Sequence, residues 1–335
     1  MSPIKPIVGT WFLLFWDYNP TGKCQDIRYD HWEPVVRRYT QAHWDAFMAD
    51  LAAIGQEYLV LVCSFSGPNG RTCVYPSKVA EDVVKLGCED PLEAVFTAAD
   101  KHGLKIFATN DFYNSVELDD AFDEDCIRAR NIILEELNQR YGHHASFYGW
   151  YLSKESYLCP YFKEDFIRYV NESAEIMRKI KPEAKILIAP YGTRLARYDE
   201  TMVDQLRRLD CDIIAYQDCV GCLANSISES AIAFSNLRKA HDAAGRSALW
   251  ADVETFEWDN GENRHDSRLI PTSWSRLEAQ LGAVSPYVDN ILVFSFQGLL
   301  TNPNSLAYCG YDESAKLYAA YTSWLQENHP DRIKS

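Results

Sequence analysis

Hydrophobic positions follow two alternating patterns along the chain. In the first pattern, apolar residues recur every three or four positions, as do Trp44, Phe47 and Leu51, which places them on one face of a helix. This segment is followed by Gly55, a residue that readily adopts the left-handed conformation that closes a helix. The pattern predicts helices over residues 41–54, 90–103, 123–141, 161–180, 199–209, 229–244, 272–287 and 314–328.

Short apolar runs lie between these segments, and such runs are typical of strands buried on both faces of a parallel sheet. They predict strands over residues 7–12, 58–64, 104–109, 147–155, 185–189, 212–216, 248–253 and 290–296. Eight strands that alternate with helices in 335 residues favour a closed barrel. A doubly wound fold usually has a glycine-rich turn after its first strand, and the stretch from Gly9 has none. We therefore predict an α/β protein with a single (β/α)8 TIM barrel over residues 1–335, with extended loops after the first and second strands.

The chain is acidic, with a formal net charge of −15 and a pI of about 5.0. Binding to nucleic acid or to an anionic membrane needs a basic face, so neither partner is expected. The apolar N-terminal stretch runs into Trp16 and Asp17 without a small-residue cleavage site, and we interpret it as a strand instead of a signal peptide. No segment approaches the roughly 20 apolar residues of a membrane span. These features predict a cytoplasmic protein and leave its oligomeric state open.

Ten cysteines are spread through the chain, and a chain of this length does not need disulfides to fold. Cys219 and Cys222 form the only pair with the spacing of a metal or redox motif. The chain has no second pair at zinc-site spacing, and no histidine flanks this pair. We therefore expect free thiols, with no metal and no cofactor.

Polar and aromatic residues follow the predicted strands, where a barrel of this kind builds its active site. In chain order these residues are Trp16, Asp17, Ser64, Asn110, Asp111, Glu155, Tyr191, Gln217, Asp218, Glu254 and Gln297. The set lacks the lysine and arginine cluster that a sugar phosphate would need. Amides and carboxylates instead bind neutral sugars, and aromatic rings stack on the C–H faces of sugars. Candidate stacking rings are those of Tyr18, Trp32, Tyr191, Trp258 and Phe296. The predicted partner is therefore a carbohydrate.

Glu155 ends the fourth predicted strand and Glu254 directly follows the seventh, on roughly opposite sides of an eight-stranded ring. Two carboxyl groups that flank one bond suit glycoside hydrolysis, since one protonates the leaving oxygen while the other attacks the anomeric carbon or activates water. The acid must keep its proton near neutral pH, through burial or a neighbouring charge. Asp252 shares the facing of Glu254 by strand alternation. We expect Asp252 to point into the barrel and to tune that carboxylate.

The segment Gly149-Trp-Tyr-Leu-Ser-Lys-Glu155 carries a family resemblance. The chain resembles the clan-A retaining glycoside hydrolases, which are TIM barrels with an acid/base glutamate after strand four and a nucleophilic glutamate after strand seven. This segment is more closely similar to the Gly-Trp-Tyr-Leu-x-x-Glu run of a bacterial family of candidate TIM-barrel glycoside hydrolases, long catalogued only as a domain of unknown function. The stretch 212–218 resembles that family too, and the likeness covers most of the chain. By position, the resemblance implies that Glu155 is the acid/base and Glu254 the nucleophile.

One position departs from the clan-A pattern. Clan-A enzymes usually carry asparagine directly before the strand-four glutamate, whereas this chain has Lys154. A contact to the sugar 2-hydroxyl is then either missing or made elsewhere, with Asn110 as the candidate. Lys154 also allows a plainer interpretation, in which Glu155 is a surface residue or a salt-bridge partner of that lysine.

Other assignments stay open on the sequence alone. A neighbouring acid could take the role of Glu254, and these acids are Asp218, Asp252 and Glu257. Metal-dependent sugar isomerases and epimerases also array carboxylates at strand ends, usually with histidine ligands, but no predicted strand end here carries histidine. A barrel that only binds glycans is a third alternative. Retention or inversion depends on the distance between the two carboxyl groups, which a sequence does not give, and the sugar, anomer and linkage are equally open.

Overall fold

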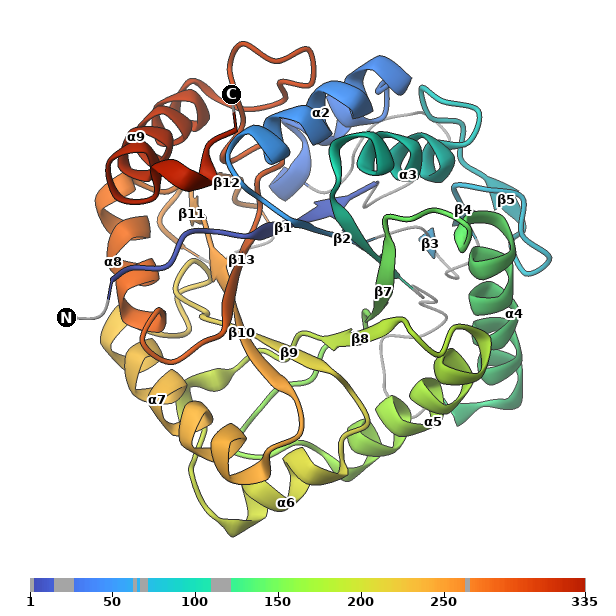
Figure 1. The fold of residues 1–335 in the computed structure, drawn as a ribbon, viewed down its shortest axis with the longest axis vertical. Helices are drawn as coiled ribbons and strands as arrows, with labels where there is room; N and C mark the ends of the chain where they lie inside the picture. The colour runs from blue at the N-terminus through green and yellow to red at the C-terminus, as the bar shows by residue number, and fades with distance from the viewer. Residues whose placement is uncertain are drawn as a thin grey trace.

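A computed structural model describes residues 3–14, 27–62, 65–66, 72–109, 122–262 and 266–334. Within them, eight parallel strands close into a barrel, and each strand pairs with its neighbours in chain order (Figure 1). The strands are β1 (Gly9–Leu13), β2 (Tyr58–Val62), β6 (Lys105–Thr109), β7 (Phe147–Leu152), β8 (Lys185–Ile188), β9 (Ile213–Gln217), β10 (Ala248–Glu254) and β13 (Asn290–Phe294). The last strand pairs with the first, with Gly9 opposite Leu292. The predicted (β/α)8 barrel is confirmed.

The long helices that follow the strands cover the outside of the barrel (Figure 1). They are α2 (Gln41–Ala53), α3 (Pro91–His102), α4 (Glu124–Tyr141), α5 (Glu164–Ile180), α6 (Glu200–Arg208), α7 (Ile227–Ala244), α8 (Trp274–Val284) and α9 (Asp312–Asn328). Each overlaps a predicted helix, because the signals at helix ends are local. At α3, for example, the Asp90 side chain accepts the Glu93 N–H at 3.0 Å, and Gly103 ends the helix with a φ of 73°. Among the described residues, no helix combines the length and apolar character that crossing a membrane requires.

Apolar side chains pack on both sides of the strands. One layer fills the space between strands and helices and includes Trp150 and Phe296. The other fills the interior of the barrel and includes Trp11, Phe107 and Trp250. Because both faces of each strand are buried, the strands appear in the sequence as continuous apolar runs instead of alternating ones.

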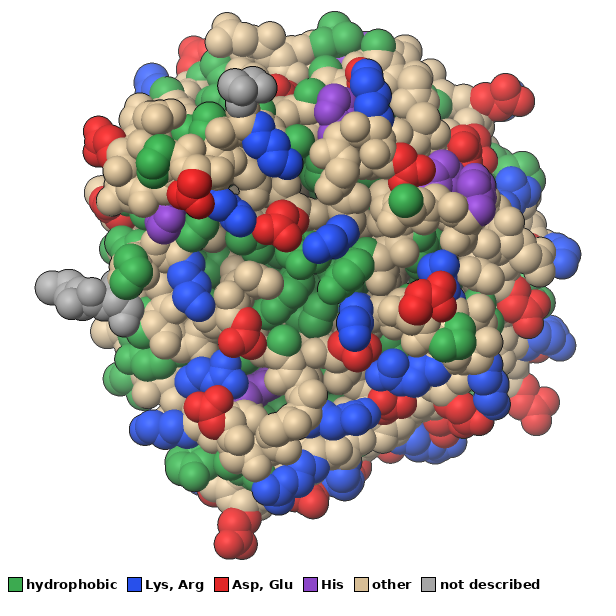
Figure 2. Space-filling view, in the orientation of Figure 1, with side chains coloured by type: hydrophobic (Ala, Val, Ile, Leu, Met, Phe, Trp, Pro, Cys, Tyr) green, Lys and Arg blue, Asp and Glu red, His purple; other side chains and the backbone are tan. Residues whose placement is uncertain are grey.

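The barrel interior is closed at the end where the strands begin. There the Tyr58 ring lies 4.9 Å from the Trp250 ring and 5.6 Å from the Tyr148 ring, and Lys105 Nζ lies 5.0 Å from the centre of the Tyr58 ring. Figure 2 shows this face, with hydrophobic side chains near its centre and lysine, arginine and acidic side chains around them. This packing leaves the carboxyl ends of the strands as the place for a site, as in other barrels of this fold.

The loops contain short elements that the sequence patterns did not predict. A small sheet follows β2 and an antiparallel pair of strands follows β10, while short helices lie in several connections. The strands are β3 (Phe65–Ser66), β4 (Thr72–Cys73), β5 (Asp82–Val83), β11 (Phe256–Trp258) and β12 (Leu269–Pro271), and the helices are η1 (Ile27–Tyr29), α1 (Glu33–Val36), η3 (Thr193–Leu195) and η4 (Pro330–Arg332). Elements of two to four residues are too short to show a hydrophobic period, so the sequence alone marks them as loop.

Candidate active site

Both predicted catalytic glutamates lie at the carboxyl end of the barrel. Glu254 is the last residue of β10, and Glu155 follows the end of β7 by three residues. On the shorter way round the ring, β8 and β9 lie between these two strands. Gln217, the last residue of β9, therefore stands between the two glutamates along the rim.

Glu155 lies on a segment that is tied to the end of β8. The Tyr191 N–H donates to the Ser156 carbonyl at 3.0 Å, and the Leu158 N–H donates to the Tyr191 carbonyl at 2.8 Å. The Gln217 Nε2 donates to Glu155 Oε1 at 2.8 Å. Water reaches the Glu155 side chain, but protein surrounds the carboxyl on its other sides, and the partial loss of hydration raises its pKa to about 7. Glu155 can therefore hold or release a proton near neutral pH.

Glu254 is held in a different way. Its side chain is only 5% exposed, and the Cys222 N–H donates to Glu254 Oε2 at 2.7 Å. Within the described residues, Oε1 makes no hydrogen bond. A Cβ added at Gly221 would lie 2.8 Å from Glu254 Cβ, so the turn that contains Cys222 packs directly against the glutamate. Loss of hydration, and then the nearby Cys219 and Asp218, raise the pKa of Glu254 well above its usual value.

Asp218 holds the backbone of Glu254 in place. It is completely buried, and its Oδ1 accepts the Glu254 N–H at 3.1 Å. Its Oδ2 accepts from Gln280 Nε2 at 2.7 Å, and the same Gln280 nitrogen donates to the Glu254 carbonyl at 3.0 Å. Loss of hydration raises the pKa of Asp218 to about 6. Because its carboxylate faces protein donors, Asp218 is a positioning residue for Glu254. Gln280 lies on α8 in no motif, so no sequence signal marks it.

Asp252 points into the barrel, as strand alternation predicts, since Trp250 on the same strand face belongs to the interior cluster. Its side chain is 4% exposed, and Asp252 Oδ1 has no hydrogen-bond partner among the described residues. The indole nitrogen of Trp11 is close to this carboxyl but lacks the geometry of a hydrogen bond. Loss of hydration raises the pKa of Asp252 well above its usual value, and the charges of Asp218 and Glu155 add to this shift.

Among the stacking candidates that lie in the described residues, Tyr191 is the exposed one. Its side chain is 38% exposed, its ring centre lies 5.3 Å from that of Tyr157, and Tyr157 is 49% exposed. The charge of Glu155 contributes to a raised pKa of Tyr191, after the larger effect of lost hydration. Tyr157 and Tyr191 thus form an aromatic surface beside Glu155. Trp258 is largely buried against Phe256, with ring centres 5.7 Å apart.

Three other predicted binding residues lie in the packed interior instead of the mouth. Trp32, Phe296 and Gln297 are all at most 1% exposed. The Phe296 ring packs 6.1 Å from that of Phe47 in the helix layer. The Gln297 amide accepts the Leu13 N–H at 2.8 Å and donates to the Leu13 carbonyl at 2.9 Å. A residue after a strand can turn toward the helices as readily as toward the barrel axis, and the sequence does not show which.

Several predicted site residues lie outside the described part of the chain. They are Trp16, Asp17, Tyr18, Ser64, Asn110 and Asp111. Their roles, including the proposed replacement of a clan-A asparagine by Asn110, stay predictions.

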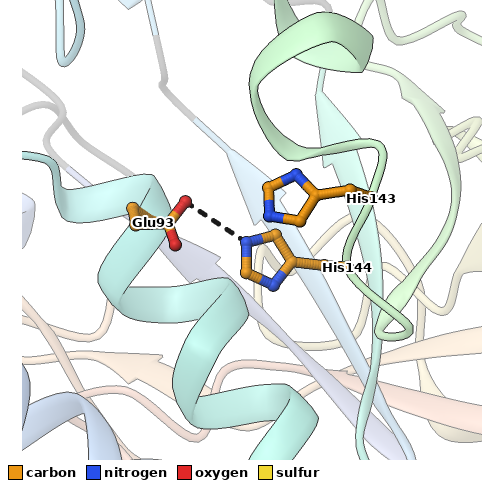
Figure 3. A group of neighbouring side chains, drawn as sticks. All are labelled: Glu93, His143 and His144. Atoms are coloured by element: carbon orange, nitrogen blue, oxygen red, sulfur yellow. Dashed lines mark hydrogen bonds and ion pairs between the residues drawn. The ribbon is translucent and has the colours of Figure 1, made fainter.

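Two groups of described residues bring three metal-binding side chains within 4.8 Å of one another. One is Cys219, Cys222 and Glu254, in the mouth; the sequence indicated the cysteine pair but not the approach of Glu254. The other is Glu93, His143 and His144, on the outside of the barrel (Figure 3). In this second group, His144 Nε2 lies 3.2 Å from a Glu93 oxygen.

The closed barrel of eight parallel strands that alternate with helices defines a TIM-barrel protein. The chain belongs to the family DUF4434, described as a domain of unknown function, whose model matches residues 8–307. This agrees with the resemblance that the segment around Glu155 indicated. No curated protein matches the chain at a significant level.

Solved structures share this fold at low sequence identity. A candidate alpha-L-fucosidase from Bacteroides thetaiotaomicron VPI-5482 is 18% identical, with a TM-score of 0.70 over 99% of this chain and 95% of that chain. The endo-beta-1,4-mannanase from Thermotoga petrophila is 10% identical, with a TM-score of 0.59 over 100% of this chain and 79% of that chain. The beta-D-glucuronidase of Dictyoglomus thermophilum is 13% identical, with a TM-score of 0.52 over 92% of this chain and 50% of that chain. These likenesses show the fold.

Proposed function

We propose that the protein is a retaining glycoside hydrolase, with Glu155 as acid/base and Glu254 as nucleophile. This proposal rests on the different environments of two glutamates at one end of the barrel. Glu155 is reached by water and has a pKa of about 7, whereas Glu254 is buried and oriented by a backbone N–H. The names of the structurally similar proteins, which are glycosidases, support the same class of reaction.

The reaction has two steps. In the first, Glu155 donates its proton to the glycosidic oxygen while an oxygen of Glu254 attacks the anomeric carbon, so that the bond to the leaving group breaks and a glycosyl ester forms. In the second, the Glu155 carboxylate takes a proton from water, and the water oxygen displaces Glu254 from the anomeric carbon. Gln217 holds Glu155 in both steps, because an amide N–H can donate to either form of the carboxyl.

Attack on the anomeric carbon requires the ionised form of Glu254. The Cys222 N–H donates to Glu254 Oε2 and favours that form, whereas Asp252 Oδ1 has no donor among the described residues. When one of these two buried acids is protonated, the N–H donor at Glu254 therefore favours the proton on Asp252. This distribution leaves Glu254 Oε1 free to attack.

The substrate is a carbohydrate, in the form of an oligosaccharide or a simple glycoside. Tyr157 and Tyr191 offer two exposed rings beside Glu155, and a sugar ring can place its apolar face on such a surface. A sugar seated there has its glycosidic oxygen on the side of Glu155 and its anomeric carbon toward Glu254.

Glutamine variants of the two glutamates test the assignment. On a panel of nitrophenyl glycosides, Glu155→Gln and Glu254→Gln are each expected to lower kcat by about a thousandfold or more while leaving the circular dichroism spectrum unchanged. Glu257→Gln is the matched control, because the Glu257 carboxylate is already engaged by Thr272 at 2.7 Å and by Arg276 at 3.1 Å. We expect this variant to keep most of its activity.

Proton NMR of the first sugar released tests the stereochemistry. A product with the anomeric configuration of the substrate is expected, and the opposite anomer would show an inverting mechanism. Full activity in either glutamine variant would remove that residue from the mechanism. Loss of activity in Glu257→Gln alone would transfer the nucleophile role to Glu257.

A further inference from the structure

The proposed hydrolysis uses the backbone N–H of Cys222 but leaves the two thiol groups of the motif Cys219-x-x-Cys222 without a role. This motif forms a turn after β9, in which Cys219 has a left-handed backbone with a φ of 56°. The Cys219 carbonyl accepts the N–H groups of Ala224 at 3.1 Å and Asn225 at 2.9 Å. The turn brings two sulfur atoms beside Glu254, so that both Sγ atoms and a carboxylate oxygen lie within 4.8 Å of one another.

Backbone hydrogen bonds hold the three metal-binding groups in advance. Cys222 Sγ donates to the Cys219 carbonyl at 3.5 Å. The Gly192 N–H donates to Cys219 Sγ at 3.4 Å, and a donor of this kind stabilises the thiolate, which is the form that binds metals. The Cys222 N–H fixes Glu254 Oε2 at 2.7 Å and leaves Oε1 without a hydrogen bond among the described residues. Cys219 is buried and Cys222 is half-buried, so Cys222 is the more accessible of the two thiols.

We propose that Cys219, Cys222 and Glu254 form a binding site for a thiophilic divalent cation of the Zn²⁺ class, and that the bound cation inhibits the protein by occupying the nucleophile. Donor atoms around a tetrahedral Zn²⁺ lie roughly 3.5–4 Å apart, which the 4.8 Å limit on these atoms accommodates. A fourth position would be open to water from the mouth. The inhibitory consequence rests on the proposed function, whereas the binding site does not.

The donor set favours one class of metal over others. Two of the three ligands are sulfur, which selects zinc, cadmium and similar ions, whereas Mg²⁺ and Ca²⁺ prefer oxygen ligands. A spacing of two residues between cysteines lets both thiolates bind one ion from a single turn. The sequence offers no second pair of ligands at zinc-site spacing, and the fold supplies the third ligand from β10 instead.

The other three-donor group serves as a comparison. His144 lies between two carboxylates, with Nε2 at 3.2 Å from Glu93 and Nδ1 at 2.7 Å from Asp100. Its ring also stacks on Phe96, with centres 5.3 Å apart. These contacts account for His144 without an ion, since a cation would have to displace the Glu93 bond seen in Figure 3. His143 on the same turn is exposed and provides a control position.

Titration of the reduced protein with Cd²⁺ tests the site without any substrate. Bound thiolates give a thiolate-to-cadmium charge-transfer band in the ultraviolet, and we expect it to saturate at one equivalent per chain. Cys219→Ser and Cys222→Ser should each lose about half of the band and bind at least about tenfold more weakly. The double serine variant should show no saturable band at one equivalent. Glu254→Gln should keep the band but bind more weakly than the wild type.

Matched variants keep this experiment decisive. His143→Ala and Cys159→Ser, which change the other donor group and an exposed cysteine, should bind Cd²⁺ as the wild type does. The proposal is overturned if the double serine variant keeps the band, or if His143→Ala alone abolishes binding. It is also overturned if Cys219 and Cys222 resist reduction, because they would then form a disulfide. Circular dichroism confirms that each variant is folded.

Inhibition is measured separately on an active glycoside. Zn²⁺ should inhibit the wild type by at least about tenfold at saturation, and the double serine variant, compared with its own metal-free rate, should be insensitive. Cadmium binding at the two cysteines in a protein without glycosidase activity would support the site and contradict the proposed function. Activation by Zn²⁺ would overturn the inhibitory role and favour metal-dependent chemistry.

Discussion

At the ends of β9 and β10, the Glu254 carboxyl is buried and accepts a backbone N–H, whereas beside β7 and β8 the Glu155 carboxyl is reached by water and is held by the Gln217 side chain. Asp218 adds a second fixed contact on the Glu254 side, at the glutamate's own backbone N–H. On the Glu155 side, the neighbouring Tyr191 ring is exposed. The same chemical group therefore has a rigid, buried setting in one half of the mouth and an open but only partly hydrated setting in the other.

This difference agrees with the separate requirements of the nucleophile and the acid/base in a retaining glycosidase. A nucleophile must stand in one place, because a misplacement of about 1 Å can cost about a hundredfold in rate. An acid/base must exchange its proton with the leaving group and with water, so its pKa has to lie near the working pH. Environments that separate two similar groups in this way are the usual route to two distinct roles.

The largest expected effect comes from a substitution that displaces Glu254 in the rigid half of the mouth. In Gly221→Ala, the new Cβ would lie 2.8 Å from Glu254 Cβ and 2.9 Å from the Phe256 carbonyl, so Glu254 and the turn that holds Gly221 must shift relative to each other. We expect kcat to fall by about a hundredfold and the free energy of unfolding to fall by about 1–3 kcal/mol. Steady-state kinetics and urea unfolding measure the two effects.

Gly282→Ala is the control for that substitution. An added Cβ there meets its nearest atom, Ile4 Cδ1, at an ordinary 3.6 Å, and the residue lies inside α8. We expect unchanged activity and a gain of about 0.5–1 kcal/mol, since alanine is favoured over glycine in a helix. Wild-type activity in Gly221→Ala would show that the Glu254 side is not rigid.

The sequence predicted the barrel and the placement of both glutamates because these depend on local patterns. Apolar runs mark the strands, and a carboxylate directly after such a run falls at the barrel mouth. It did not predict that Phe296 and Gln297 are buried away from the mouth, because that depends on the path of the chain after β13. Nor did it predict the contact between Cys222 and Glu254, because this contact joins two loops that follow different strands. The expectation that the cysteine pair binds no metal rested on the absence of a second pair at zinc-site spacing and of a flanking histidine. The approach of Glu254 to the two sulfur atoms is visible only in the fold.

A smaller effect is expected on the pKa of Glu155 in the open half of the mouth. The Gln217 amide lowers the pKa of Glu155 by donating to its carboxylate, against the larger upward effect of lost hydration. Without that donor the pKa rises. In the wild type, kcat/KM should fall as the pH rises through about 7, where Glu155 loses the proton it must donate. In Gln217→Leu, this fall should move up by about one pH unit.

The full pH profile of kcat/KM measures this shift. Tyr191→Phe is the control, because it leaves the hydrogen bond between Gln217 and Glu155 in place. It can alter KM but should not move the basic limb of the profile. A basic limb that stays in place in Gln217→Leu, or moves to lower pH, would contradict the assignment of Glu155 as the acid.

The smallest effect is on stability. The pKa of Glu155 is raised from 4.5 to about 7 in the folded protein, so the folded state binds this proton more tightly than the unfolded state. The resulting stability is present below about pH 4.5 and is lost as the pH rises through about 7. Glu155→Gln does not titrate. The free energy of unfolding of the wild type relative to this variant should therefore fall by about 1 kcal/mol between pH 4 and pH 8, an amount reduced by the water that screens the carboxyl.

Glu164→Gln provides a control of opposite sign. The hydrogen bond from Arg208, and then that from Gln205, lower the pKa of Glu164 to about 2. Its contribution is therefore present above about pH 4.5 and is lost as the pH falls toward 2. Relative to Glu164→Gln, the wild type should gain stability between pH 2 and pH 5, whereas relative to Glu155→Gln it should lose stability between pH 4 and pH 8. Urea unfolding across this range measures both. If the free energy of unfolding of the wild type rises with pH relative to both variants, Glu155 is an ordinary surface carboxylate. The contrast between the two halves of the mouth then fails.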